Sequence, residues 1–342
     1  MKNFIAKSQS AQEYECGYSC DNALLLKIDG GLFFITDGRY GLEAKERSKN
    51  CEVIEGNDIF SQARRLLRKS GIKTLTIDPL EFTYGDYRAF QNKLTHIHLH
   101  TAANFHQKIR SVKKEAEIEK IKTATIENKE AFDRFADFLS KVGLDKTEAE
   151  LHYAAKGFLE QKGTRKLSFD PIFAIGENAA KPHALPTDKR LKIGSTVLFD
   201  AGTKYESYCS DRTRTALFHE SGIAFGTEQR FSDSTQQTIY DLALKAHDTA
   251  IESARAGMKA AELDLIARKV IENGGYGEFF THSLGHGVGL DIHEEPFINK
   301  RNNLTLQNGM VFTIEPGIYI PNEFGVRIED IVVLKNNRAE IL

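Results

Sequence analysis

The first hundred residues alternate between short apolar runs and segments with helical spacing. Ala23 to Ile28 and Gly31 to Thr36 are apolar runs separated by an Asp-Gly pair, which predicts a β-hairpin. Ile59 to Lys69 has apolar residues at helical intervals and stops just before a glycine, a typical helix end. Leu75 to Ile77 predicts a further buried strand. Strands that alternate with helices in this way predict a small α/β domain.

The pattern changes in the segment from Ser111 to Lys129, which is rich in charged residues. Its apolar residues recur at helical intervals and continue beyond the segment, so we interpret it as a linker that runs into a long helix. A chain of 342 residues is long enough for two domains of ordinary size. We therefore expect an N-terminal domain over residues 1–110 and a second domain over residues 111–342.

Thr147 followed three residues later by Glu150 has the form of a capping box, which predicts the start of a helix. Gly163 is the expected end of that helix. Beyond this point strand patterns dominate and two helices are grouped between them, which is typical of an α+β domain. The expected strands are Ser168 to Ile175, Thr196 to Ala201, Ser207 to Phe218, Val311 to Tyr319 and Val326 to Leu334, and the expected helices are Ser234 to Ala256 and Ala260 to Glu272.

Charge and composition narrow the class of function. Lys and Arg number 46 against 48 Asp and Glu, so no excess of positive charge favours a nucleic-acid or membrane-surface partner. No apolar run approaches the roughly 20 residues of a membrane span, and the N-terminal residues lack the apolar core of a secretory signal. The four cysteines form no Cys-x-x-Cys pair, which fits unpaired thiols in a reducing compartment. We therefore expect a cytoplasmic protein.

Four carboxylates and one histidine in the second domain are candidate metal ligands. Asp200 ends an apolar strand, and Asp211 follows eleven residues later, so a hairpin would bring the two carboxylates side by side. His286 stands among glycines, Glu315 precedes a Pro-Gly pair, and Glu329 lies in a further strand. Carboxylates that converge on one cavity repel each other and lose hydration, and divalent cations relieve both costs.

The chemistry of this donor set indicates the kind of metal. One imidazole among carboxylates suits Mn²⁺, Co²⁺ or Zn²⁺. Two such ions about 3.5–4 Å apart can share an activated water as nucleophile and polarise a carbonyl group. Spacing alone leaves an ordinary interpretation open, since a single acidic residue at a strand end is usually a surface residue and His286 could equally occupy a turn.

A second histidine pattern is a weaker candidate. Alternation along the segment from Thr95 to His100 places three histidines on one face of a strand. No acidic residue is nearby in the sequence, so we expect a solvated strand face and no metal site there.

Longer sequence words in the second domain provide a more specific signal. From about Ile109 to the C-terminus the chain resembles the pita-bread metallopeptidases, in the branch that contains the Xaa-Pro aminopeptidases and the prolidases. The words that carry the resemblance are Ser168 to Ile172, Asn178 to His183, Phe199 to Gly202, Ser210 to Thr215, His282 to Glu294, Ile314 to Tyr319 and Val326 to Asp330. The implied fold is a C-terminal pita-bread catalytic domain preceded by a smaller α/β domain, α+β overall.

The resemblance also implies roles for individual side chains. The implied metal ligands are Asp200 on one ion, His286 and Glu315 on the other, and Asp211 and Glu329 as bridges between them. Catalytic roles are implied for His183, His293 and Glu315, and substrate-binding or supporting roles for His282, Tyr319 and Arg327. These roles are chemically reasonable, because a neutral imidazole can donate to a developing oxyanion or carry a proton to a leaving nitrogen.

The first domain adds to the expected function. Gly17 to Leu26 and Phe34 to Tyr40 resemble the N-terminal domain of Xaa-Pro aminopeptidases, which closes over the active site, often that of a partner subunit. We therefore expect a homodimeric Xaa-Pro aminopeptidase with two divalent ions, Mn²⁺ in first place, that acts on short proline-containing peptides. The alternatives are a prolidase limited to dipeptides, another hydrolase on the same fold, and a metal-free binding module, which the intact ligand set disfavours.

Overall fold

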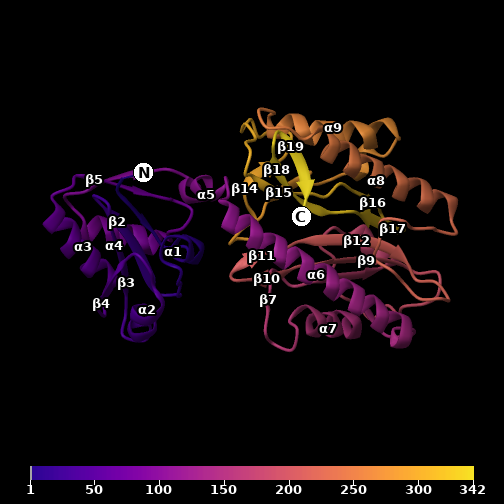
Figure 1. Cartoon of the computed structure of the whole chain (residues 1–342), viewed down its shortest axis with the longest axis horizontal. Coiled ribbons are helices and arrows are strands. Elements are labelled where there is room, and N and C mark those ends of the chain that lie inside the picture. The colour runs from indigo at the N-terminus through magenta and orange to yellow at the C-terminus, as the bar shows by residue number, and fades with distance from the viewer. Residues whose placement is uncertain (1) are drawn as a thin grey trace. The chain divides into compact units, whose positions relative to one another are not determined.

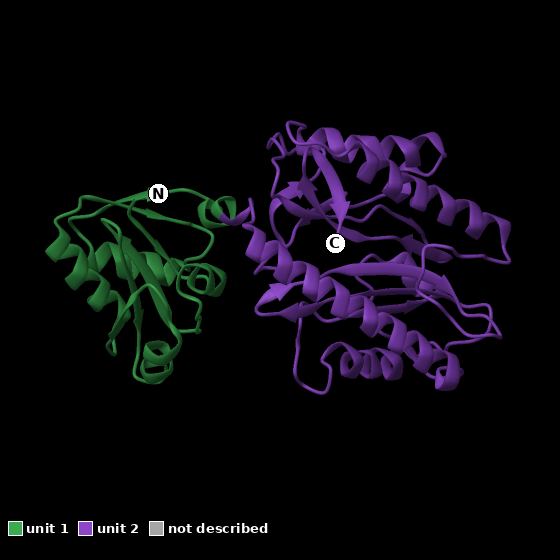
Figure 2. Cartoon of the chain, in the orientation of Figure 1, with its two compact units in different colours: residues 1–109 green, residues 110–342 purple. Residues whose placement is uncertain are grey.

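A computed structural model describes residues 2–342 and divides into two compact units, unit 1 over residues 1–109 and unit 2 over residues 110–342 (Figures 1 and 2). No helix among the described residues combines the length and the apolar character that crossing a lipid bilayer requires. The elements of the first part of the chain are β1 (Phe4–Ala6), α1 (Gln9–Cys16), β2 (Ala23–Ile28), β3 (Gly31–Thr36), α2 (Gly41–Arg47), β4 (Glu52–Glu55), α3 (Ile59–Ser70), β5 (Thr74–Ile77), α4 (Tyr84–Lys93), β6 (His98–Thr101) and α5 (Phe105–Arg110).

Unit 1 contains a six-stranded mixed sheet in the order β4-β3-β2-β1-β5-β6. The expected hairpin is confirmed, because β2 and β3 pair antiparallel over the two apolar runs. Asp29 and Gly30 form its turn with φ of 48° and 90°, the left-handed pair that matches the twist of a two-residue hairpin. The expected helix is also confirmed as α3, which ends at a left-handed Gly71.

Unit 2 contains two principal sheets, β12-β9-β8 and β14-β13-β15-β18-β19, and two smaller ones, β11-β10-β7 and β16-β17. Its helices are α6 (Glu115–Val142), α7 (Glu148–Leu159), α8 (Ser234–Ser253) and α9 (Ala260–Asn273), with short 3₁₀ turns η1 (Gly176–Ala180) and η2 (Gly277–Phe279). Its strands are β7 (Lys166–Leu167), β8 (Ile172–Ile175), β9 (Thr196–Ala201), β10 (Thr203–Tyr205), β11 (Tyr208–Cys209), β12 (Arg212–Leu217), β13 (Gly285–Gly287), β14 (Glu294–Ile298), β15 (Val311–Ile314), β16 (Gly317–Ile320), β17 (Phe324–Arg327), β18 (Asp330–Lys335) and β19 (Arg338–Ile341).

Each principal sheet of unit 2 is covered by its own pair of helices (Figure 1). One apolar core joins α6 and α7 to β8, β9 and β12, with Phe135 and Phe199 fully buried in it. The other core joins α8 and α9 to β15 and β18, around Leu263 and Phe312. Burying one such side chain contributes about 1.5–3 kcal/mol relative to leaving it exposed. The expected α+β class is therefore confirmed, with the sheets between two helical layers.

Several expected boundaries are wrong, each for a local reason. The helix α7 ends at Leu159 and not at Gly163, because Gln161 and Lys162 already adopt left-handed φ angles before that glycine. The strand expected over 168–175 is confined to β8, since Pro171 cannot donate to a sheet ladder. The strand expected over 207–218 is interrupted at Ser210, whose backbone N–H and hydroxyl both donate to the Thr203 carbonyl.

The capping box at the start of α7 is confirmed and generates a stability prediction. The Thr147 hydroxyl accepts from the Glu150 backbone N–H at 3.2 Å, and the Glu150 carboxylate accepts from the Thr147 N–H at 2.8 Å. Replacing Thr147 by Ala should lower the free energy of unfolding by about 0.5–2 kcal/mol, measured by urea denaturation. Thr123→Ala is the control, because that residue lies inside α6 and alanine is a better helix former. Equal effects of the two substitutions would contradict the capping role.

Candidate metal centre

One side of the candidate centre is formed by β9 and the start of β12. The antiparallel register places Asp200 of β9 opposite Thr213 of β12, and Asp211 directly precedes β12. The expected hairpin therefore brings the two carboxylates to one end of this sheet. Both residues are buried, with only 8% and 5% of their surfaces exposed.

The other side comes from the five-stranded sheet. Glu315 follows β15 and Glu329 precedes β18, and the pairing of Ile314 with Asp330 places the two glutamates at the same end of that ladder. A hydrogen bond from the Glu329 N–H to the Thr213 carbonyl, 3.1 Å long, joins this sheet to β12. The two ladders therefore meet at the ends that carry the four carboxylates.

His286 reaches the centre from β13, where it stands between two glycines. A Cβ atom at Gly285 would lie 2.0 Å from the Thr313 carbonyl oxygen, and one at Gly287 would lie 2.4 Å from the Glu295 carbonyl oxygen. Only glycine therefore permits the close approach of β13 to its two neighbouring strands. This packing explains the Gly-His-Gly sequence and fixes where the imidazole enters.

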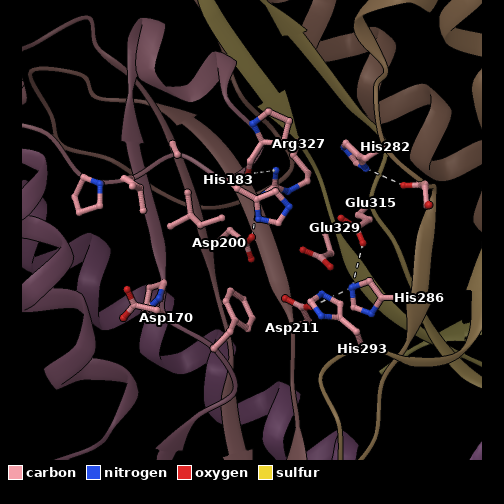
Figure 3. Close-up of a pocket in the computed structure, with 18 residues that line it drawn as sticks. Asp170, His183, Asp200, Asp211, His282, His286, His293, Glu315, Arg327 and Glu329 are labelled. Carbon is pink, nitrogen blue, oxygen red and sulfur yellow. Dashed lines mark hydrogen bonds and ion pairs between the residues drawn. The ribbon is translucent and has the colours of Figure 1, made fainter. Parts of the chain in front are cut away.

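The five candidate ligands converge in a cavity of about 410 Å³ (Figure 3). The His286 Nε2 atom lies 3.3 Å from Glu315 Oε1 and 3.6 Å from Asp211 Oδ2. Asp211, His286 and Glu329 each place one ligand atom within 4.8 Å of the others. The cavity is lined by Phe169, Asp170, Pro171, Ile172, Pro182, His183, Ala184, Leu185, Pro186, Asp200, Asp211, His282, Ser283, His286, His293, Glu315, Arg327 and Glu329.

The buried carboxylates carry charge that the protein does not fully neutralise. Burial raises the pKa of Asp211 well above its ordinary value, and the negative charge of Glu329 raises it further. Burial likewise raises the pKa of Glu329, and the charge of Glu315 adds to this effect. Glu315 differs, because the hydrogen bond and charge of His286 outweigh the effect of burial and lower its pKa. An additional positive charge in the cavity would stabilise this arrangement.

The donor set fits divalent cations. Oδ2 of Asp200 accepts a hydrogen bond from Arg327, whereas Oδ1 is buried without a hydrogen-bond partner among residues 2–342. An unpartnered buried carboxylate oxygen is costly unless a cation or donor reaches it. Carboxylate oxygens with one imidazole nitrogen are the ligands of Mn²⁺, Co²⁺ and Zn²⁺ sites. The chemistry expected from the sequence is therefore compatible with the geometry.

Arg327 fixes the orientation of Asp200 through a buried network. Its Nη2 donates to Asp200 at 2.6 Å, its Nε donates to the Thr213 hydroxyl at 3.0 Å, and its Nη1 donates to the Tyr319 hydroxyl at 2.8 Å. The Tyr319 oxygen also lies 2.8 Å from Nε2 of His282. Burial raises the pKa of Tyr319 to about 12, so the phenol stays protonated at neutral pH.

Three further histidines, the expected His183, His282 and His293, line the same cavity. Burial lowers the pKa of His282 and of His293, and the neighbouring His286 lowers that of His293 further. Both rings are therefore neutral at neutral pH. The rings of His286 and His293 are in edge contact, with centroids 4.3 Å apart. Of the candidate residues, Tyr319 alone lies behind the lining, where it contacts Arg327 and His282.

Two threonines belong to the centre and were not recognised from the sequence. The Thr213 hydroxyl donates to Glu329 at 2.5 Å, and the Thr313 hydroxyl donates to Glu315 at 3.1 Å. Each lies two residues from a candidate ligand, Asp211 or Glu315, and alternation puts such pairs on one face of a strand. This periodicity is the sequence signal that would have found them. As expected, the three histidines of the segment from Thr95 to His100 are exposed.

Comparisons with protein families support the assignment of both domains. Residues 119–336 match metallopeptidase family M24, and residues 1–112 match the creatinase/prolidase N-terminal domain. An uncharacterized peptidase of Bacillus subtilis, YqhT, is 33% identical over 97% of this chain and 91% of its own length. An uncharacterized peptidase of Staphylococcus haemolyticus is 41% identical over 69% of this chain, and this match spans only 63% of that relative.

Solved structures with related sequences have the same fold over the whole chain. An Xaa-Pro dipeptidase from Bacillus anthracis has a TM-score of 0.89 at 29% identity, covering 99% of this chain and 92% of its own. An X-Pro aminopeptidase from Thermotoga maritima has a TM-score of 0.86 at 32% identity, covering 100% and 95%. A prolidase from Pyrococcus furiosus has a TM-score of 0.85 at 33% identity, covering 100% and 96%. The chain thus belongs to metallopeptidase family M24, the pita-bread family expected from its sequence words.

Proposed function

We propose that this metallopeptidase is an Xaa-Pro aminopeptidase, which releases the first residue of peptides that have proline in the second position. The observation that carries the proposal is that the described lining of the cavity offers no cationic side chain that is available to bind a substrate carboxylate. Arg327 is the only permanently cationic side chain among the described residues of its lining, and all three of its guanidinium nitrogens are engaged. A dipeptidase must capture the free carboxylate of proline, normally with an available cation. An aminopeptidase leaves that end open for the continuing chain.

The shape and polarity of the cavity support a proline-directed enzyme. An Xaa-Pro bond lacks the amide N–H that many peptidases bind, so recognition of the substrate depends on the pyrrolidine ring of its proline. Apolar side chains from Phe169, Ile172 and Leu185 line the cavity beside the carboxylates. Such a surface can accommodate a pyrrolidine ring without requiring a hydrogen bond from the scissile nitrogen.

The residues that would hold two divalent ions are Asp200, Asp211, His286, Glu315 and Glu329, with Mn²⁺ in first place and Co²⁺ or Zn²⁺ as alternatives. When bound, the ions would supply Lewis acidity for the scissile carbonyl and lower the pKa of the attacking water. The Arg327 fork holds Asp200 in one orientation, and Tyr319 extends that network to His282. These contacts restrain the direction of the Asp200 carboxylate.

Two histidines of the cavity lining, His183 and His293, are candidates for proton transfer. A ring nitrogen of His293 or His183 that faces the cavity can donate to the developing oxyanion or deliver a proton to the leaving proline nitrogen. The lowered pKa of His293 keeps its ring neutral, so it can accept a proton as well as donate one. Glu315, paired with His286, completes the catalytic set inferred from the sequence.

A prolidase is the second candidate, because related structures include an Xaa-Pro dipeptidase and a prolidase as well as an X-Pro aminopeptidase. Both activities require the same ligands, so the ligand set does not distinguish them. A homodimer in the cytoplasm is part of our proposal and rests on the family resemblance alone. Short proline-containing peptides are the proposed substrates.

Substrate length is the direct test. With Mn²⁺ bound, a tripeptide Xaa-Pro-Yaa should be cleaved with a kcat/KM at least equal to that of the dipeptide Xaa-Pro. The reason is that no available cation in the described lining binds the free proline carboxylate of the dipeptide. Product analysis by chromatography gives both rates, and Xaa-Ala-Yaa is the matched control. Protein shown by elemental analysis to be metal-free should be inactive and should recover with Mn²⁺ or Co²⁺. Efficient cleavage of the dipeptide alone would assign the protein as a prolidase.

Removing one carboxylate charge should separate metal binding from folding. Glu329→Gln keeps an acceptor for the Thr213 hydroxyl but removes a buried negative charge, so the metal-free variant should be at least as stable as the metal-free parent. Mn²⁺ at about 100 times its dissociation constant should stabilise the parent by about 2.7 kcal/mol and the variant by less. Denaturation with and without metal measures both values. Glu130→Gln, on the exposed face of α6, is the control, and an unchanged metal effect in Glu329→Gln would refute the ligand assignment.

The proposed proton-transfer role of His293 has its own test. His293→Ala should leave metal content unchanged and reduce kcat by about 10²–10⁴-fold, the usual contribution of a general acid or base. His98→Ala, which alters an exposed histidine of β6, should have no effect. Wild-type turnover in His293→Ala would show that another group transfers the proton.

A further inference from the structure

A buried ion cluster lies next to the candidate centre and has no part in the ligand set. Glu294 directly follows His293 and is 1% exposed. Its Oε1 accepts from Lys113 Nζ at 2.8 Å and its Oε2 accepts from Arg110 Nη1 at 3.0 Å. The other terminal nitrogen of Arg110 donates to Asp291 at 2.7 Å. Two cations from the start of unit 2 are therefore bound to the loop that carries His293.

The cluster is hydrogen-bonded to the backbone on either side of His293, next to the candidate active site. Glu294 pairs with Gly287 across β13 and β14, one residue from His286. The Glu294 carboxylate also accepts from the Asp291 backbone N–H at 3.3 Å, so it closes the loop on both sides of His293. His293 itself makes no side-chain hydrogen bond within residues 2–342. Its ring is in edge contact with the ring of His286, and the direction from which it approaches that ring depends on the backbone that Glu294 holds.

The charges in this cluster require each other. A buried carboxylate is costly unless cations and hydrogen bonds satisfy it, and removing one partner leaves the other charges uncompensated. The segment that supplies the cations is anchored independently, because the Lys113 N–H donates to the Gly309 carbonyl at 2.8 Å and Val112 forms a bridge with Met310. A side-chain substitution at Lys113 should therefore alter the cluster and leave the segment in place.

We infer that Arg110, Lys113 and Glu294 form a positioning brace that sets the direction of the His293 ring in the active-site cavity. None of the three lines the cavity, so they act through His293 and do not touch substrate. This inference rests on the proposed role of His293 in peptide hydrolysis. Arginine and lysine serve different purposes in the brace. The guanidinium of Arg110 spans two carboxylates, those of Glu294 and Asp291, whereas the ammonium of Lys113 binds one carboxylate, that of Glu294, and donates at 3.5 Å to the Ser111 carbonyl.

A double-mutant cycle tests the brace. Lys113→Met should lower kcat by about 10- to 100-fold with KM and metal content unchanged, as expected for a misplaced catalytic group. The same substitution should change kcat by less than about twofold in the His293→Ala background, because coupled residues are not additive. Lys113→Arg, which retains the charge, should restore most of the rate. Equal losses in both backgrounds would overturn the inference.

Controls separate positioning from general destabilisation. Glu127→Gln breaks the Arg165 ion pair outside the cavity and should leave kcat unchanged. In metal-free protein with isotope-labelled histidine, the His293 ring resonances should shift in Lys113→Met and stay fixed in Glu127→Gln. Unchanged His293 resonances in Lys113→Met would reject the brace, whatever the activity of the parent. Failure of the parent to hydrolyse Xaa-Pro peptides would reject the proposed function and would leave the resonance test of the brace valid. If Lys113→Met folds poorly, Arg110→Lys provides the second measurement and should shift the same resonances.

Discussion

The burial of four carboxylates in one cavity is the constraint on which the rest of unit 2 depends. Unlike charges on a surface, these groups cannot be screened by solvent, and each raises the cost of ionising its neighbours. The opposite pKa directions of Glu315 and Glu329 follow from this competition, because His286 pairs with Glu315 at 3.3 Å and lowers its pKa, whereas burial and the charge of Glu315 raise that of Glu329. The arrangement is stable only if the fold supplies positive charge from fixed directions.

The two β-ladders determine where the four carboxylates lie. Asp200 and Asp211 come from one antiparallel pair and the two glutamates from another, so their spacing is set by strand register and not by flexible loops. Arg327 lies at the end of β17 and donates to groups on β9, β12 and β16, which ties both halves of unit 2 together. A guanidinium is suited to this position because its planar fork presents several donors at fixed angles.

Local patterns in the sequence were sufficient to predict local structure. The turn between β2 and β3 follows from an Asp-Gly pair, and the start of α7 follows from Thr147 and Glu150, because each depends on residues close in the chain. The same reasoning placed the end of α7 at Gly163, because it had no means of showing that Gln161 already leaves the helical region. The longer motifs that resemble a known family predicted that the candidate ligands share one site, whereas the spacing of single residues indicated only separate acidic residues.

Contacts between residues that are far apart in the chain could not be predicted from the sequence. Arg110 and Glu294 are separated by 184 positions, and neither belongs to a pattern that indicates the other. Thr213 carried a signal in its alternation with Asp211, but a threonine in a strand has too many ordinary explanations for that signal to stand alone. What the sequence omitted is therefore the set of groups that orient the ligands and the histidines, since these act through tertiary contacts.

This division between ligands and orienting groups bears on specificity. An identical metal centre can hydrolyse a dipeptide or a longer peptide, because the attacked carbonyl is the same in both. The choice between them depends on whether a cation is available beyond the ligand set, and in this cavity the one permanent cation is committed to Asp200 among the residues described. Freeing Arg327 to bind a substrate carboxylate would leave Asp200 buried without its counter-charge, a loss that outweighs one exposed ion pair. The stability of the centre therefore opposes carboxylate capture by this arginine, and discrimination by substrate length must arise from other groups or be weak.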